Sequence, residues 1–329
     1  MVRTHFLFLS DPSPELKKEI KSSDPIQCLA TPPVYVVQPS MGSIPTSQLL
    51  PPEDHATLHE LVAISCKFDT TTATTVPLAD IDHYLEVVAI ALQLVKPTRG
   101  FLEYSLEFDS QRGVTSMSTS TQSVALQLMH SNPYLRYQEH HTIMPDDVKR
   151  AISLLTRVSQ AMELHQSSWT HSYGSIHRAL VFFCQGYTVN LHDLKQLFWA
   201  AGLDCLFASK KDSRKRGART ISERLQRLWG ADFRPYSADT VNIPIHQSRP
   251  DHHLIDIGEH IFWLRNAFIH GLTIKPSWLS PAGSLEQGYA YQLFECTEIL
   301  LRLTLVRLFE DTGLFDVFLD PVELDKYFS

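Results

Sequence analysis

The chain has 329 residues, 43% of them hydrophobic and 20% charged, which is ordinary globular composition and enough length for two domains or one large one. Its net charge of −7 argues against a protein that coats nucleic acid over its whole surface, so any such contact has to come from a local basic patch. The five cysteines form no CxxC pair, which favours reduced thiols in a reducing compartment and argues against a zinc knuckle.

The sequence carries no membrane signal. No run reaches the ~18 apolar residues of a membrane-spanning helix, and no long apolar region with a small-residue cleavage site follows the N-terminus. The sequence therefore predicts a cytoplasmic protein that makes no contact with a membrane.

The first 142 residues mix strand and helix patterns and show no chemical signature. Prolines divide residues 1–52 into short apolar runs, which favours edge strands over helices. Farther on, helical spacing and strict alternation of apolar residues both occur. The expected elements are edge strands at Phe6–Leu9 and Val34–Val37, a short helix within 53–66, a helix at Leu78–Val95, a half-buried strand at Phe101–Phe108 and a loop at Thr115–Ser123.

From Pro145 onward the pattern is helical, so we place the main boundary near residue 142. The fold class expected for the whole chain is α+β: residues 1–142 form a mixed α+β region of unknown role, and 143–329 an all-α helical bundle. The helix at Leu191–Phe207 is apolar nearly all round, which predicts a place in the middle of the bundle. Other helices are expected from Pro145, at Ile176–Cys184, after a capping box formed by Thr220 and Glu223, up to Gly271, and at Gln287–Leu308.

The stretch Ile261–Gly271 differs from the rest because polar side chains interrupt an otherwise apolar helix. Asn266 and His270 are four residues apart and share a helix face, and Arg265 is long enough to reach round to the same place. Gly271 supplies the left-handed residue that ends a helix. We therefore expect an Arg, an Asn and a His to converge at a helix end.

Residues 145–310 resemble the HEPN superfamily, and within it the Apea-like HEPN domains. The resemblance rests on the helix ending Ala-Gly-Leu-Asp-Cys-Leu-Phe207, a basic linker, an Ile-Ser-Glu-Arg-Leu helix start, and Leu-Arg-Asn-Ala-Phe-Ile-His-Gly271. It implies a helical bundle that forms homodimers, and a motif made of Arg265, Asn266 and His270. Where the family pattern suggests Glu on the central helix, this chain has Asp204.

The resemblance implies a metal-independent endoribonuclease without cofactor, a toxin or antiviral-defence effector that cleaves RNA. Such cleavage needs a base for the 2′-OH proton, an acid for the leaving oxygen and fixed positive charge for the phosphorane. His270 and Arg265 fit those requirements, and a dimer would supply both acid and base. Asp204 and Glu259 are the supporting carboxylates. The basic run expected to bind RNA is Lys210, Lys211, Arg214, Lys215, Arg216 and Arg219.

Several other interpretations remain open from the sequence. Arg265 can instead pair with Asp204 or Glu259 while His270 caps the helix end, in an inactive HEPN scaffold that binds RNA, a nucleotide or a regulatory protein partner. The basic run can be a solvated linker. We expect no metal site, although the pairs His140–His141 and His252–His253 contain metal-ligand residue types. The segment Arg136–His141 repeats the Arg-to-His spacing but lacks an apolar helical pattern.

Overall fold

The computed structural model describes residues 2–9, 13–16, 18, 26–27, 34–37, 62–69, 78–96, 101–102, 104–109, 113–119, 142–163, 174–189, 191–208, 217–231, 233, 254–272 and 287–329, with backbone alone for the strands and for parts of some helices. The chain divides into two compact units, Met1–Ser159 and Gln160–Ser329. The expected domain ranges, 1–142 and 143–329, stay predictions.

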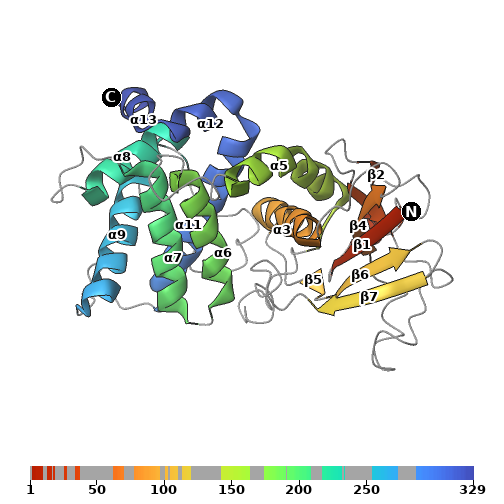
Figure 1. Ribbon diagram of the computed structural model, residues 1–329. Helices are drawn as coiled ribbons and strands as arrows, with labels where there is room; N and C mark the ends of the chain where they lie inside the picture. The colour runs from red at the N-terminus through yellow and green to blue at the C-terminus, as the bar shows by residue number, and fades with distance from the viewer. Residues whose placement is uncertain are drawn as a thin grey trace. The chain divides into compact units, whose positions relative to one another are not determined.

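The backbone of the first unit contains an antiparallel sheet (Figure 1). The strand order is β2-β3-β4-β1-β6-β7, and β5 pairs with β1. Because β1 has neighbours on both sides, the run Phe6–Leu9 is not at an edge as expected. The strands are β1 (Val2–Leu9), β2 (Ile26–Gln27), β3 (Val34–Val37), β4 (Val62–Asp69), β5 (Phe101–Leu102), β6 (Tyr104–Asp109) and β7 (Gly113–Thr119).

Two local predictions in this unit are wrong. The short helix expected within 53–66 overlaps strand β4, which begins at Val62, and its residues 53–61 lie outside the described part of the chain. From Val62 to Asp69 apolar residues alternate with small or polar ones, which is the period of a strand. The expected loop Thr115–Ser123 begins inside β7, which pairs with β6. Thr is well suited to a paired strand, so its abundance there misled the loop prediction.

The core of the first unit is helical where its side chains are described. Every residue from Val87 to Val95 in α3 (Leu78–Val95) is buried, and α5 (Pro145–Glu163) buries one face. The α+β fold class, with a mixed α+β N-terminal region, is therefore corrected: where side chains are described the regular structure is helical and contains no strand. The reason is that the buried side chains described in this unit lie mainly on α3 and α5, where apolar residues recur at helical spacing.

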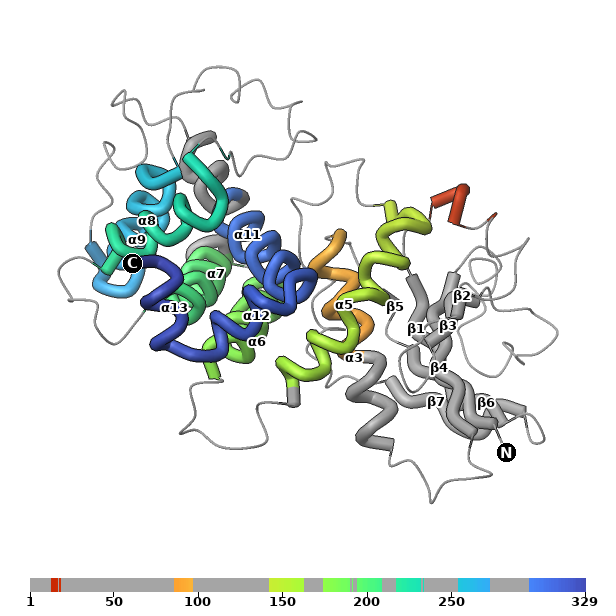
Figure 2. Tube along the Cα trace, turned by 90° about the horizontal axis from the view of Figure 1, so that it is seen from above, coloured from red at the N-terminus to blue at the C-terminus, as the bar shows by residue number. Residues whose placement is uncertain are grey.

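The second unit is a helical bundle around α7. This helix contacts α6, α8, α9 and α11, and Figure 2 shows it among its neighbours. The central position expected from its apolar sequence is thus confirmed. The helices are α6 (Gly174–Thr188), α7 (His192–Phe207), α8 (Gly217–Trp229), α9 (Leu254–His270), α11 (Gln287–Glu310), α12 (Thr312–Leu319) and α13 (Pro321–Tyr327).

Close backbone approach fixes how α7 sits on α6 and α11. A Cβ on Gly202 would lie 2.6 Å from the Leu301 side chain and 3.3 Å from the Ala179 carbonyl oxygen, so a larger residue would force the Leu301 side chain and the α6 backbone to shift. At the other end of the α6–α7 contact, the Trp199 indole donates to the Phe183 carbonyl at 3.2 Å. The register of α6 against α7 is therefore set at two points.

Helix α8 begins at Gly217, so the predicted capping box of Thr220 and Glu223 is wrong. Thr220 lies inside the helix, and the Glu223 carboxylate pairs with Arg219 one turn earlier. The hydrophobic pattern begins at Ile221, whereas the helix starts one polar turn before it.

No helix in the part of the chain that the structure describes is long and apolar enough to cross a membrane.

Candidate functional site

Helix α9 ends as its sequence predicts. Gly271 has a φ of 59°, the left-handed conformation that glycine adopts without steric cost. The Leu272 N–H donates to the Ala267 carbonyl at 2.9 Å, and the Gly271 N–H to the Phe268 carbonyl at 3.4 Å. These are the two hydrogen bonds of a Schellman motif, and they place His270 at the last position before the chain turns.

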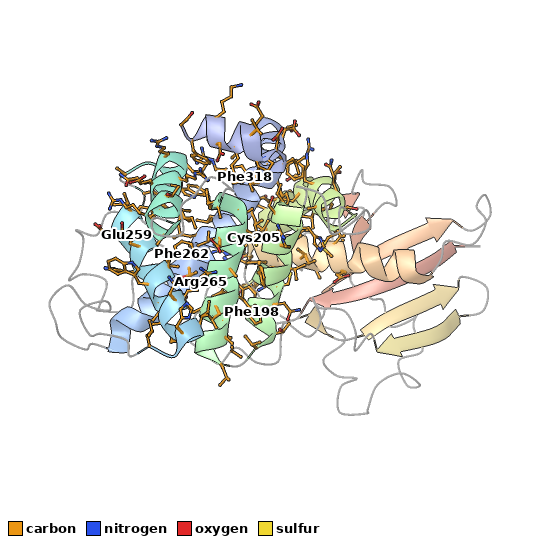
Figure 3. The ribbon with its side chains drawn as sticks, turned by 60° about the vertical axis from the view of Figure 1, so that its left-hand side comes forward. Phe198, Cys205, Glu259, Phe262, Arg265 and Phe318 are labelled. Atoms are coloured by element: carbon orange, nitrogen blue, oxygen red, sulfur yellow. The ribbon has the colours of Figure 1, made fainter. Side chains whose placement is uncertain are left out.

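Arg265 leaves α9 toward the central helix. Its Nη2 donates to the Asp204 carboxylate of α7 at 3.1 Å, in a pair whose side chains are 25% and 33% exposed (Figure 3). Of the two carboxylates that the sequence offered as partners of Arg265, Asp204 and Glu259, it is Asp204 that pairs with it. Only one guanidinium nitrogen is used in this pair, so the others can still donate to a ligand.

His270 and Asn266 lie on a different side of α9 from Arg265. Five residues separate Arg265 from His270, which is a rotation of about 140° around a helix axis. His270 is exposed and Asn266 is half-buried. Among the described residues no hydrogen bond or ion pair joins Arg265 to either side chain, so one chain alone brings together the arginine and Asp204 but not the arginine and the histidine.

Glu259, the second supporting carboxylate, serves a different arginine. Its Oε1 accepts from Arg219 Nη1 at 2.8 Å, and Arg219 Nε also donates to Glu223 at 2.9 Å. These hydrogen bonds, that to Glu259 first, hold the pKa of Arg219 above its ordinary value. Arg219 thus links α8 to α9. The remaining residues of the basic run, Lys210, Lys211, Arg214, Lys215 and Arg216, lie outside the described part of the chain.

Two residues that the sequence analysis did not connect to the site lie near Arg265. Cys205 follows Asp204 on α7, and burial raises the pKa of its thiol to about 11. The positive charges of Arg178 on α6 and of Arg265 oppose that rise in the pKa of Cys205, and the negative charge of Asp204 adds to it. A thiol with so high a pKa is a poor nucleophile, so we interpret Cys205 as a packing residue.

Arg178 could not have been found from the motif, because it belongs to a helix some 90 residues earlier. The signal was the spacing between Arg178 and Phe182, which are four apart and so share a face of α6. The Phe182 ring stacks on Phe198 of α7 with centroids 6.1 Å apart. Arg178 is exposed, so it lies at the edge of the α6 face that packs on α7.

Metal-ligand residue types do not gather in the part of the chain that could be searched. No group of three His, Cys, Asp or Glu residues close enough to hold a metal ion occurs among the described residues. The histidine pairs His140–His141 and His252–His253, and the Arg136–His141 segment, lie outside them.

Comparisons with family models, with curated proteins and with solved structures find no match to this chain.

Proposed function

We propose that the chain is a metal-independent endoribonuclease of HEPN type, whose site is the C-terminal half of α9 with Asp204 of α7. The observation that supports this proposal concerns the Arg265 side chain, which is 25% exposed. Its guanidinium donates one hydrogen bond to Asp204 in the described part of the chain, which orients it, and its other N–H groups can donate to a phosphate. In this proposal Arg265 stabilises the phosphorane, His270 transfers a proton, and Asn266 orients the phosphate or the imidazole. The biological role would be that of a toxin or antiviral-defence effector.

The reaction requires two copies of the chain. Each chain contributes one motif histidine, and that histidine lies about 140° around α9 from its own Arg265. Two helix ends that face one another in a homodimer would supply an acid and a base to one phosphate. Ile269 and Leu272, on either side of His270, are each 53% exposed, and apolar side chains in that position favour contact with another protein surface.

RNA would reach the site along the basic run. Arg219 is shared by two carboxylates, so we assign the electrostatic attraction to Lys210, Lys211, Arg214, Lys215 and Arg216. Replacing Lys210, Lys215 and Arg216 by Gln should weaken binding and flatten its salt dependence by about two units, since single-stranded contacts contribute ~0.7 each. If affinity and salt dependence stay at the wild-type values, the run is a solvated linker.

The decisive experiment incubates the full chain with single-stranded RNA in EDTA. We expect cleavage that leaves 2′,3′-cyclic phosphate ends, and at least ~100-fold slower cleavage by His270→Ala at an unchanged melting temperature. His260→Ala is the matched control, because His260 lies on the same helix against Trp263, with ring centroids 5.5 Å apart, and outside the motif. Cleavage that survives His270→Ala at the wild-type rate would exclude the proposed chemistry.

An inactive HEPN scaffold is the second candidate. The Arg265–Asp204 ion pair favours it, because a charge that already has a partner can serve packing alone. Such a scaffold would bind RNA, a nucleotide or a regulatory protein, and residues 1–142 would then act as the sensor. RNA binding without any cleavage under the conditions above, in both monomeric and dimeric fractions, would favour this function.

A further inference from the structure

Three helices of the second unit place charged and aromatic side chains along one side of α7. Phe182 of α6 stacks on Phe198, and both are half-buried. Toward the C-terminal end of α7 come Asp204 and Cys205, which are also only half-buried. This side of α7 is therefore bordered by α6 on one flank and by Arg265 of α9 on the other, as Figure 3 shows for Phe198, Cys205 and Arg265.

Arg178 stands one helical turn from Phe182 on the same face of α6. The carbonyl of its neighbour Ala179 approaches Gly202, so the chain position of Arg178 is level with Gly202 and the residues that follow. Arg178 is exposed, and within the described part of the chain it forms no ion pair. Its guanidinium carbon lies 3.5 Å from where a Cβ on Gly174 would be, so the group extends along α6 and not into the core.

The charges in this place do not balance. Among the described residues that border this side of α7, Arg178 is exposed and Arg265 is 25% exposed, and both carry positive charge, whereas Asp204 carries the negative charge that pairs with Arg265. The net charge of the whole chain is −7, so a surplus of positive charge on a partly exposed surface stands out against its surroundings. Two guanidinium groups with free donors are suited to phosphate oxygens.

We propose that Arg178 and Arg265 together bind a phosphodiester of single-stranded RNA on this side of α7, with Arg178 as a binding residue that the Arg-to-His motif does not include. The inference rests on the proposed function for its substrate class. Phe182 lies one helical turn from Arg178 and stacks on Phe198 of α7, and because both rings are only half-buried, a base of the bound strand could stack on them. Proteins that bind single strands combine positively charged side chains, which contact the phosphates, with aromatic rings, on which the bases stack.

The test measures binding of a short, fluorescently labelled RNA in which every 2′-OH is methylated, so that cleavage cannot occur. Anisotropy titrations over roughly 50 to 200 mM salt give the affinity and its salt dependence. For Arg178→Gln we expect about ten-fold weaker binding and a salt slope reduced by about 0.7, the value for one phosphate contact. Phe198→Leu should weaken binding without changing the slope, because stacking releases no counterions.

Lys326→Gln is the matched control, because Lys326 is 76% exposed on α13 and its loss changes the charge by the same amount. Arg178→Gln with wild-type affinity and slope would overturn the inference, as would an equal loss in Lys326→Gln. If the wild type nevertheless cuts RNA that has free 2′-OH groups, either of these outcomes overturns the binding site at Arg178 but not the proposed nuclease activity. If Arg178→Gln behaves as expected but the wild type cuts no RNA, the binding site stands and the nuclease does not. A wild type that fails to bind the methylated RNA overturns the inference outright.

Discussion

Two arginines of the second unit, each paired with an aspartate on another helix, differ in how far their hydrogen-bonding capacity is used. Arg224 of α8 donates to the Phe207 carbonyl and to Asp325 of α13, and its guanidinium lies 5.9 Å from the centre of the Phe328 ring. Within the described residues, Arg265 of α9 makes one hydrogen bond, to Asp204. The side chain of Arg224 is 10% exposed and that of Arg265 25% exposed.

The comparison separates an arginine that holds the fold from one that is available to a ligand. Removing Arg224 would leave a backbone carbonyl and a carboxylate without their partner in a buried place, whereas the Asp204 carboxylate beside Arg265 still reaches water. Pairing with an aspartate is common to both, so pairing alone does not identify a structural arginine. The number of filled donors and the exposure of the partner do.

The largest effect is expected from Arg224→Met. Breaking a largely buried charge pair costs about 3 kcal/mol, and α13 would lose the ion pair that joins it to α8. Thermal unfolding of the full chain should show a clear fall in melting temperature. Lys326→Met, which removes a 76% exposed cation from α13, is the control. A loss no larger than that of the control would contradict the structural role of Arg224.

Lys195 sharpens the comparison, because it is buried without any partner. It is 2% exposed, its Nζ makes no hydrogen bond among the described residues, and desolvation lowers its pKa. Lys195→Met should therefore stabilise the chain by about 1–2 kcal/mol at neutral pH. Since the folded pKa lies below the unfolded one, wild-type stability should rise as the pH increases between the two values, and the advantage of Met should shrink there.

Unfolding of both proteins in urea from neutral pH to about pH 10 measures that difference. An advantage that is absent at neutral pH, or that grows with pH, would contradict the burial of a cation at this position.

How far the sequence predicts this molecule depends on whether the relevant residues lie on one helix. The Gly271 stop, the central place of α7 and the buried face of α9 follow from the spacing of residues within one segment, and the structure confirms them. The sequence limited the expected partner of Arg265 to two carboxylates, those of Asp204 and Glu259, because a helical bundle can bring either of them within reach of the guanidinium. Arg178 was missed, since its place depends on the register of α6 against α7, which Gly202 sets through packing.

Predictions failed where local composition and pairing disagree. The residues from Val62 to Asp69 contain helix-compatible spacings as well as strict alternation, and only a partner strand decides between the two. The polar first turn of α8 carries no hydrophobic signal. Its ion pair between Arg219 and Glu223 lies within α8, whereas the pair between Arg219 and Glu259 requires α8 and α9 to lie side by side. The five-residue spacing of Arg265 and His270 already places them about 140° apart around a helix, so the expectation that their side chains converge within one chain overlooked helix geometry.

A smaller effect is expected from Arg265→Met, in direct contrast to Arg224→Met. A single hydrogen bond between partly exposed groups contributes less than about 1 kcal/mol, so the melting temperature should change little. A double-mutant cycle with Asp204→Asn isolates that contribution. A coupling as large as the loss caused by Arg224→Met would show that Arg265 is structural, and would count against its proposed part in catalysis.

The smallest effect concerns the thiol between the two arginines. Because the charges of Arg178 and Arg265 lower the pKa of Cys205 against the dominant effect of burial, removing either charge should raise that pKa further and reduce the thiolate fraction. Alkylation of Cys205 near pH 9, followed by mass spectrometry, should therefore slow several-fold in Arg178→Gln and in Arg265→Gln. Asp204→Asn should accelerate it, because the carboxylate raises the thiol pKa. Lys326→Gln should leave the rate unchanged. An unchanged alkylation rate in Arg178→Gln would show that the charge of Arg178 does not act on Cys205. It would then also count against a place for Arg178 on the side of α7 where the phosphodiester site is proposed.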